Sequence, residues 1–145
     1  MVRSKPRLIQ YELPGSWTVV LGASDADNDY VSAVLAAPED YWFHAHGVPG
    51  SHVILRAKAQ EEPDRETLRR AAAVAAYHSK ARRAGTVQVH CTRARHVRKP
   101  RGAKVGTVRV AKGTVLRVRP DISFATRVRA DEAMATETNR IPVPR

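Results

Sequence analysis

Six short stretches of the chain have the composition or the alternation of apolar and polar residues that is typical of β-strands. They are WTVVL at 17–21, YWFH at 41–44, HVILR at 52–56, VQVHC at 87–91, GTVRV at 106–110 and TVLRV at 114–118. In the last two, valine alternates with basic residues, so one face should be buried and the other should form a basic surface. AKG at 111–113 would join these two strands as a tight hairpin, because Gly113 tolerates a positive φ.

A helical period replaces this pattern at residues 65–84, RETLRRAAAVAAYHSKARRA. One face, at spacings of three and four, consists of Leu68, Ala71, Ala72, Ala75, His78 and Ser79. Asp64 suits the N-cap position and Gly85 suits the position after the helix. We therefore predict an α+β fold in which one long alanine-rich helix packs on a mostly antiparallel sheet. Residues 31–35 are an ambiguous apolar piece, either a short helix or a turn.

The length of 145 residues suits one domain. We expect an N-terminal extension at 1–16, the folded domain at 17–119 and a partly disordered or loosely docked tail at 120–145. A single cysteine, Cys91, excludes an internal disulfide and zinc sites that need two or four cysteines. The sequence has neither a long apolar run nor a secretory signal, so we expect a cytoplasmic protein with no membrane partner.

The distribution of charge indicates the class of partner. The net charge is +11, yet residues 1–66 carry 6 Lys/Arg against 10 Asp/Glu. Residues 67–120 carry 15 Lys/Arg and no acidic residue, and residues 121–145 carry four of each. A block of this kind favours a polyanion, either nucleic acid or an anionic membrane surface. A solvated basic face that only aids solubility is the alternative.

Basic residues are densest in TRARHVRKPRGAKVG at 92–106. This loop contains Arg93, Arg95, Arg98, Lys99, Arg101 and Lys104. Gly102 and Gly106 allow the backbone to approach a ligand closely, and the pattern of a nucleotide-hydrolase phosphate loop is absent. We expect these six side chains, with Arg82 and Arg83 near the end of the predicted helix, to contact phosphates.

Three histidines fall within nine positions: His44, His46 and His52. In a strand, His44 and His46 share one face, so the three are candidate zinc ligands, and a metal-dependent RNA-processing or RNA-modifying enzyme stays open. A structural role beside the turn at 47–50 is the second interpretation. We prefer a third, in which the turn presents Ser51 and His52 to phosphate or ribose. We therefore expect no metal, no cofactor and no catalytic residue, and a protein that is not an enzyme.

Several separate motifs, in this order and spacing, resemble the NFACT RNA-binding domain family over about residues 17–119. They are Asn28–Asp29, Asp40 with Trp42–Phe43–His44, Gly50–Ser51–His52, the alanine-rich Ala71 to Arg82 with Ser79, and Lys99 to Gly106 with Gly102. The motif residues Asn28, Asp29, Asp40, Trp42, His44, Gly50, Ser79, Gly102 and Gly106 are expected to be structural. The resemblance implies binding of structured RNA, either tRNA or ribosomal RNA, by phosphate contacts and shape.

Large relatives carry this domain at the C-terminus of ribosome-associated quality-control factors, which implies the large ribosomal subunit as a further partner and a role in translation. The chain departs from the family pattern at Ala23 and Val34, where basic residues are common, and at Val105, where proline is common. A protein-interaction module whose basic face meets an acidic protein remains a rival interpretation.

Overall fold

The structure, a computed structural model, describes residues 5–129 and contains a seven-stranded sheet in the order β8-β5-β3-β4-β2-β1-β9. Every neighbouring pair in this sheet is antiparallel. The strands are β1 (Leu8–Leu13), β2 (Trp17–Gly22), β3 (Tyr41–Ala45), β4 (Val53–Leu55), β5 (Val87–Arg93), β8 (Thr114–Val118) and β9 (Thr126–Val128). A second, two-stranded sheet pairs β6 (Val97–Arg98) with β7 (Arg109–Val110).

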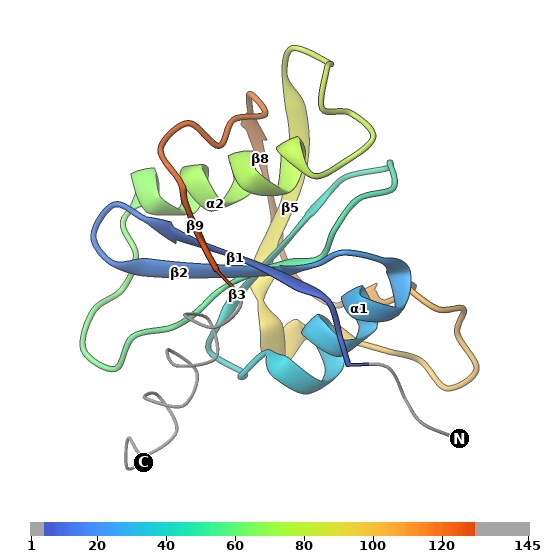
Figure 1. Ribbon diagram of the computed structural model, residues 1–145. Coiled ribbons are helices and arrows are strands. Elements are labelled where there is room, and N and C mark those ends of the chain that lie inside the picture. Colours follow the sequence, from blue (N-terminus) through green and yellow to red (C-terminus); the bar gives the residue numbers. More distant parts are fainter. Residues whose placement is uncertain (1–4, 130–145) are drawn as a thin grey trace.

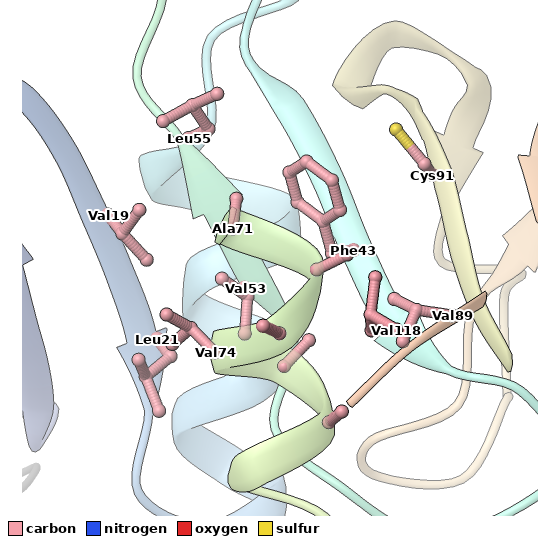
Figure 2. Packing of buried hydrophobic residues seen from close by; sticks show 14 of the residues in the cluster. Val19, Leu21, Phe43, Val53, Leu55, Ala71, Val74, Val89, Cys91 and Val118 are labelled. Atoms are coloured by element: carbon pink, nitrogen blue, oxygen red, sulfur yellow. The ribbon is translucent and has the colours of Figure 1, made fainter. Parts of the chain in front are cut away.

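Helix α2 (Arg65–Tyr77) covers the inner face of the large sheet (Figure 1). Ala71 to Ala76 form a run of small buried residues, so the helix lies close to the inward side chains of the strands, as Phe43 and Val74 show in Figure 2. Its other side is covered by the segment between β8 and β9, where the Asp121 N–H donates to the Ala73 carbonyl at 3.3 Å. The main core of the protein therefore lies between these layers.

The outer face of the sheet carries α1 (Asp25–Tyr30), a π-helical turn (Val31–Leu35) and the β6–β7 pair. Val20, Val31, Trp42 and Ile54 form a second buried cluster there, and the valines of β6 and β7 pack against it. These elements cover the outer face around Trp42, on the side opposite α2 (Figure 1). Within residues 5–129, no helix combines the length and the apolar character that crossing a membrane requires.

The prediction of one long alanine-rich helix was wrong, because α2 has only 13 residues and ends at Tyr77. Its expected start is confirmed, since the Asp64 carboxylate accepts from Thr67 N–H at 2.8 Å. Beyond Tyr77 the backbone pairs with the turn at 49–51: Ser51 N–H donates to the His78 carbonyl at 3.0 Å, and Lys80 N–H to the Pro49 carbonyl at 2.9 Å. These long-range hydrogen bonds replace the ones that would have continued the helix. Helical structure also occurs outside α2, in α1 and the turn that continues it.

The hairpin expected between 106–110 and 114–118 was also wrong. Strand β7 pairs with β6, whereas β8 pairs with β5, and the φ of Gly113 is not positive. A Cβ at Gly113 would lie 3.1 Å from the Cys91 carbonyl oxygen, so this glycine permits close approach to β5.

The sheet also takes one strand from each segment that flanks residues 17–119. Strand β1 lies within residues 1–16 and pairs with β2 and β9, and β9 lies within residues 120–145. The tail that we predicted to be partly disordered is residues 120–145. Of these, residues 130–145 lie outside the described residues.

Candidate nucleic-acid interface

Two adjacent residues of α1 connect motifs that are far apart in the sequence. The buried Asn28 holds the turn before β4: its Oδ1 accepts from His52 N–H at 3.0 Å, and its Nδ2 donates to the Gly50 carbonyl at 3.4 Å. Asp29 holds the basic loop instead, because its Oδ1 accepts from Gly106 N–H at 3.0 Å. The Asn-Asp pair therefore fixes the positions of two loops relative to one helix.

The basic loop is anchored at both of its ends. Lys99 Nζ lies 3.3 Å from Asp29 Oδ2 and also donates to the Lys104 carbonyl. Gly106 has a φ of +84° and Gly102 a φ of +78°, in the region that favours glycine. Lys99 is thus committed to the loop's own structure, although the sequence alone suggested a phosphate contact.

Four exposed cations surround this anchored loop: Arg98, Arg101, Lys104 and Arg109, which we call the loop face. Arg98 and Arg109 are direct partners in the β6–β7 pair. Side chains that project from a fixed backbone lose less conformational freedom on binding a phosphate than side chains on a mobile loop. The loop face is therefore a candidate surface for a polyanion.

Arg93 and Arg95 lie away from the loop face, although the sequence grouped them with it. Arg93 donates to Glu62 Oε1 at 2.7 Å and stacks over the Tyr41 ring, with 4.1 Å between the guanidinium carbon and the ring centroid. Arg95 donates to Glu39 Oε2 at 2.7 Å. These two cations are partly neutralised by acids from the N-terminal half of the chain.

Arg82 and Arg83 follow α2 and are both exposed. Arg82 Nε donates to the Tyr77 carbonyl at 2.7 Å, and its guanidinium carbon lies 4.2 Å from the centroid of the Tyr77 ring. Arg82 also lines a shallow concavity of about 310 Å³ with Lys80. The structure therefore separates these arginines from the loop face and places them at a second basic position.

The turn at Ser51 and His52 uses its polar groups inside the protein. Ser51 N–H donates to the His78 carbonyl at 3.0 Å, and the Ser51 hydroxyl to the Gly22 carbonyl at 2.8 Å. His52 is only 3% exposed, and its Nδ1 lies 2.7 Å from Ser32 Oγ. Burial, followed by the nearby His44, lowers the pKa of His52 to about 4.

The remaining motif residues hold the backbone in place. The fully buried Asp40 accepts from Ala57 N–H at 2.7 Å and from Ala37 N–H at 2.9 Å. Trp42 Nε1 donates to Ser32 Oγ at 2.9 Å. Ser79 donates to the Ala76 carbonyl at 2.7 Å and forms a β-bridge with Gly50. Each of these three side chains therefore has a structural role through the hydrogen bonds that it makes.

An open groove of about 560 Å³ separates the histidines from the basic loop. His44, His46 and His52 line one side, and Pro100 and residues 106–110 line the other. His90, which was not among the predicted site residues, also lines the groove, with its ring centroid 4.5 Å from that of His46. The alternation of apolar and polar residues in VQVHC could have indicated His90, because it places this side chain on the sheet face opposite to that of Val87 and Val89.

Among residues 5–129, no group of three or more His, Cys, Asp or Glu side chains is arranged to hold a metal ion. Burial, followed by neighbouring histidines, lowers the pKa of both His44 and His90. Neutral rings of this kind suit stacking and hydrogen bonding.

Comparisons with known proteins agree on one family. The sequence profile described as NFACT protein RNA binding domain matches residues 9–112. The chain is 40% identical over 116 residues to the Rqc2 homolog RqcH of Bacillus subtilis (strain 168), covering 80% of this chain and 20% of that protein. It is 37% identical over 106 residues to the Rqc2 homolog RqcH of Streptococcus suis (strain 05ZYH33), covering 73% of this chain and 19% of that protein.

A solved structure is similar as well. It is the C-terminal part of the fibronectin/fibrinogen-binding protein from Streptococcus suis (FBPS), with a TM-score of 0.73 and 34% identity. The likeness covers 83% of this chain and 47% of that chain. Against the curated relatives, by contrast, the chain spans only about a fifth of their length.

Proposed function

Because this chain belongs to the NFACT RNA-binding domain family, we propose that it binds structured RNA through the cations of the loop face. The observation that carries the proposal is the anchored basic loop. Arg98, Arg101 and Lys104 are exposed on a backbone that Asp29 fixes at Gly106. Guanidinium and ammonium groups in such an arrangement suit phosphate oxygens, which position a protein on RNA without reading its sequence.

The RNA that we propose is tRNA or ribosomal RNA, in ribosome quality control in the cytoplasm. The support is the similarity to proteins named Rqc2 homolog RqcH. Because the similarity spans about a fifth of those proteins, we propose RNA binding and contact with the large ribosomal subunit, and not their whole activity. We further propose that the chain acts by binding, without catalysis.

A triple variant tests this function directly. Arg98→Ala, Arg101→Ala and Lys104→Ala together should weaken binding to bulk tRNA and to ribosomal RNA alike, because phosphate contacts do not depend on sequence. The thermal midpoint should change little, since substitutions of exposed side chains typically change stability by under about 0.5 kcal/mol. Binding is measured by fluorescence anisotropy at fixed salt.

The matched control removes the same charge elsewhere. Arg65 and Arg69 lie on α2 and Arg127 on the edge strand β9, and all three are exposed. Their triple alanine variant has the same net charge as the first and should keep most of the RNA affinity. Equal losses in the two triple variants would mean that the net charge, and not the loop face, determines binding.

A further inference from the structure

Part of the outer sheet face is left open beyond the elements that cover Trp42. His44 on β3 lies directly opposite His90 on β5, and His90 lies directly opposite Val115 on β8. Leu116 and Val118 pack in the core, so Val115 and Arg117 alternate to the outer side. His46 is exposed, and Val115 is 44% exposed. The rings of three histidines and the side chain of Val115 thus form a row on the uncovered part of the outer sheet face.

The rings of this row lie close together. The centroids of His46 and His90 are 4.5 Å apart, and His44 lies directly opposite His90 on the neighbouring strand. The lowered pKa values of His44 and His90 leave both rings neutral at neutral pH. Neutral rings beside an exposed valine form a surface that suits the flat face of a base better than a phosphate.

Cations flank this row on two sides. Arg109 lines the groove of about 560 Å³ from the loop side, and Arg117, which pairs with Gln88 across β5–β8, lies in the next row of the sheet. Of the described residues that line the groove, none is acidic. The charge therefore complements a nucleic-acid backbone that passes along the groove, with its bases toward the rings.

We propose that the sheet surface formed by His44, His46, His90 and Val115 binds unpaired nucleotides of RNA by stacking their bases, while Arg109 and Arg117 contact the adjoining phosphates. The inference rests on the proposed RNA binding and deepens it by naming single-stranded segments as a ligand class. Sequence-specific RNA recognition commonly uses this geometry, in which splayed bases stack on rings that project from an open sheet. Stacking tolerates many bases because every base has a π face.

The test compares two ring variants on two RNA probes. The double variant His46→Ala with His90→Ala removes the outermost rings, whereas His46→Phe with His90→Phe keeps a flat ring at both positions. The probes are a 12-nucleotide unpaired RNA carrying 2-aminopurine, whose fluorescence falls on stacking, and a blunt duplex RNA of the same length. Thermal midpoints of both variants are measured alongside.

The alanine variant should bind the unpaired RNA about tenfold more weakly, which matches the loss of base stacking. Its affinity for the duplex should change by less than about twofold, because the duplex contacts only the loop face. The phenylalanine variant should retain both the affinity and the 2-aminopurine quenching. These three results together support the stacking surface.

The opposite outcomes separate this inference from the proposed function. If both variants bind both probes like the wild type while the loop-face triple variant loses binding, RNA binding stands and the stacking surface is wrong. If the wild type binds neither probe, both proposals fail. Binding of an acidic peptide that competes with the unpaired RNA and depends on the same rings would also overturn the choice of ligand.

Discussion

The Asp29 carboxylate and the Gly106 backbone are joined across 77 positions of sequence, with Oδ1 accepting the Gly106 N–H at 3.0 Å. An acidic side chain is thus built into the anchor of a loop that is otherwise basic. A negative charge beside the proposed phosphate-binding surface would weaken attraction to a polyanion, so we assign Asp29 a positioning role. The second oxygen, near Lys99 Nζ at 3.3 Å, restrains the start of the same loop.

This relationship predicts effects of different size for two variants of one residue. Asp29→Ala removes both loop contacts, so RNA affinity should fall although a negative charge is lost. Asp29→Asn keeps the oxygen that accepts from Gly106 but loses the ion pair with Lys99 Nζ, so its affinity should exceed that of Asp29→Ala. Anisotropy titrations with bulk tRNA provide the comparison. If the alanine variant binds more tightly than the wild type, Asp29 acts through charge alone.

Gly50 should be intolerant of a side chain. A Cβ there would lie 2.8 Å from Ser79 Cβ, and overpacking of this kind typically costs about 1–3 kcal/mol. Gly50→Ala should therefore lower the free energy of unfolding by about that amount in urea titrations. Gly85→Ala is the matched control, because a Cβ at Gly85 meets nothing within 4 Å.

A second substitution should relieve the clash at Gly50. Ser79→Gly removes the Cβ that the new methyl would meet, so the double variant should be less destabilised than the sum of the two single variants. Strict additivity would show that the contact between these positions is not the cause.

The end of α2 shows what the sequence leaves open. The start at Asp64 was predictable because an N-cap depends on local side chains, here Asp64 and Thr67. Residues 78–84 include good helix formers, yet the backbone of His78 and Lys80 pairs with residues 49–51 instead. These hydrogen bonds to residues about 30 positions away leave no local pattern in the sequence. The helix predicted from the pattern alone was therefore too long.

The site was predictable to a similar degree. Composition indicated the basic block at 67–120, and the basic loop at 92–106 was predicted from its lysines and arginines. The neutralisation of Arg93 was not foreseeable, because its partner Glu62 is 31 positions away and comes into contact only through the packing of β5 beside the chain that leads to α2. His90 lies beside the other histidines because the register of β3 with β5 places it opposite His44, and the sequence does not show this register.

Buried histidines predict a loss of stability in mild acid. The folded-state pKa of His52 is about 4, below its ordinary value of 6.5, so the unfolded chain takes up the proton first. The contribution of His52 to stability should therefore fall as pH falls from about 6.5 to 4 and change little below that. For His52 alone we expect a loss of about 2 kcal/mol between pH 7 and pH 5. His78, whose pKa is also lowered to about 4 by burial and then by Arg82, acts in the same direction.

Urea unfolding at pH 7, 6 and 5 measures this loss. His52→Asn cannot titrate and should lose about 2 kcal/mol less over the same interval than the wild type. Equal losses in the two proteins would show that the pKa of His52 is not lowered in the folded state.

The salt dependence of RNA affinity tests the central claim most directly. Four phosphate contacts from the loop face predict a slope of about −3 in a plot of log affinity against log salt concentration, at about 0.7–0.9 per contact. The triple variant Arg98→Ala, Arg101→Ala and Lys104→Ala should retain a slope near −1, whereas the control variant Arg65→Ala, Arg69→Ala and Arg127→Ala should keep the full slope. A slope near zero in the wild type, or the same slope in all three proteins, would contradict RNA binding through the loop face.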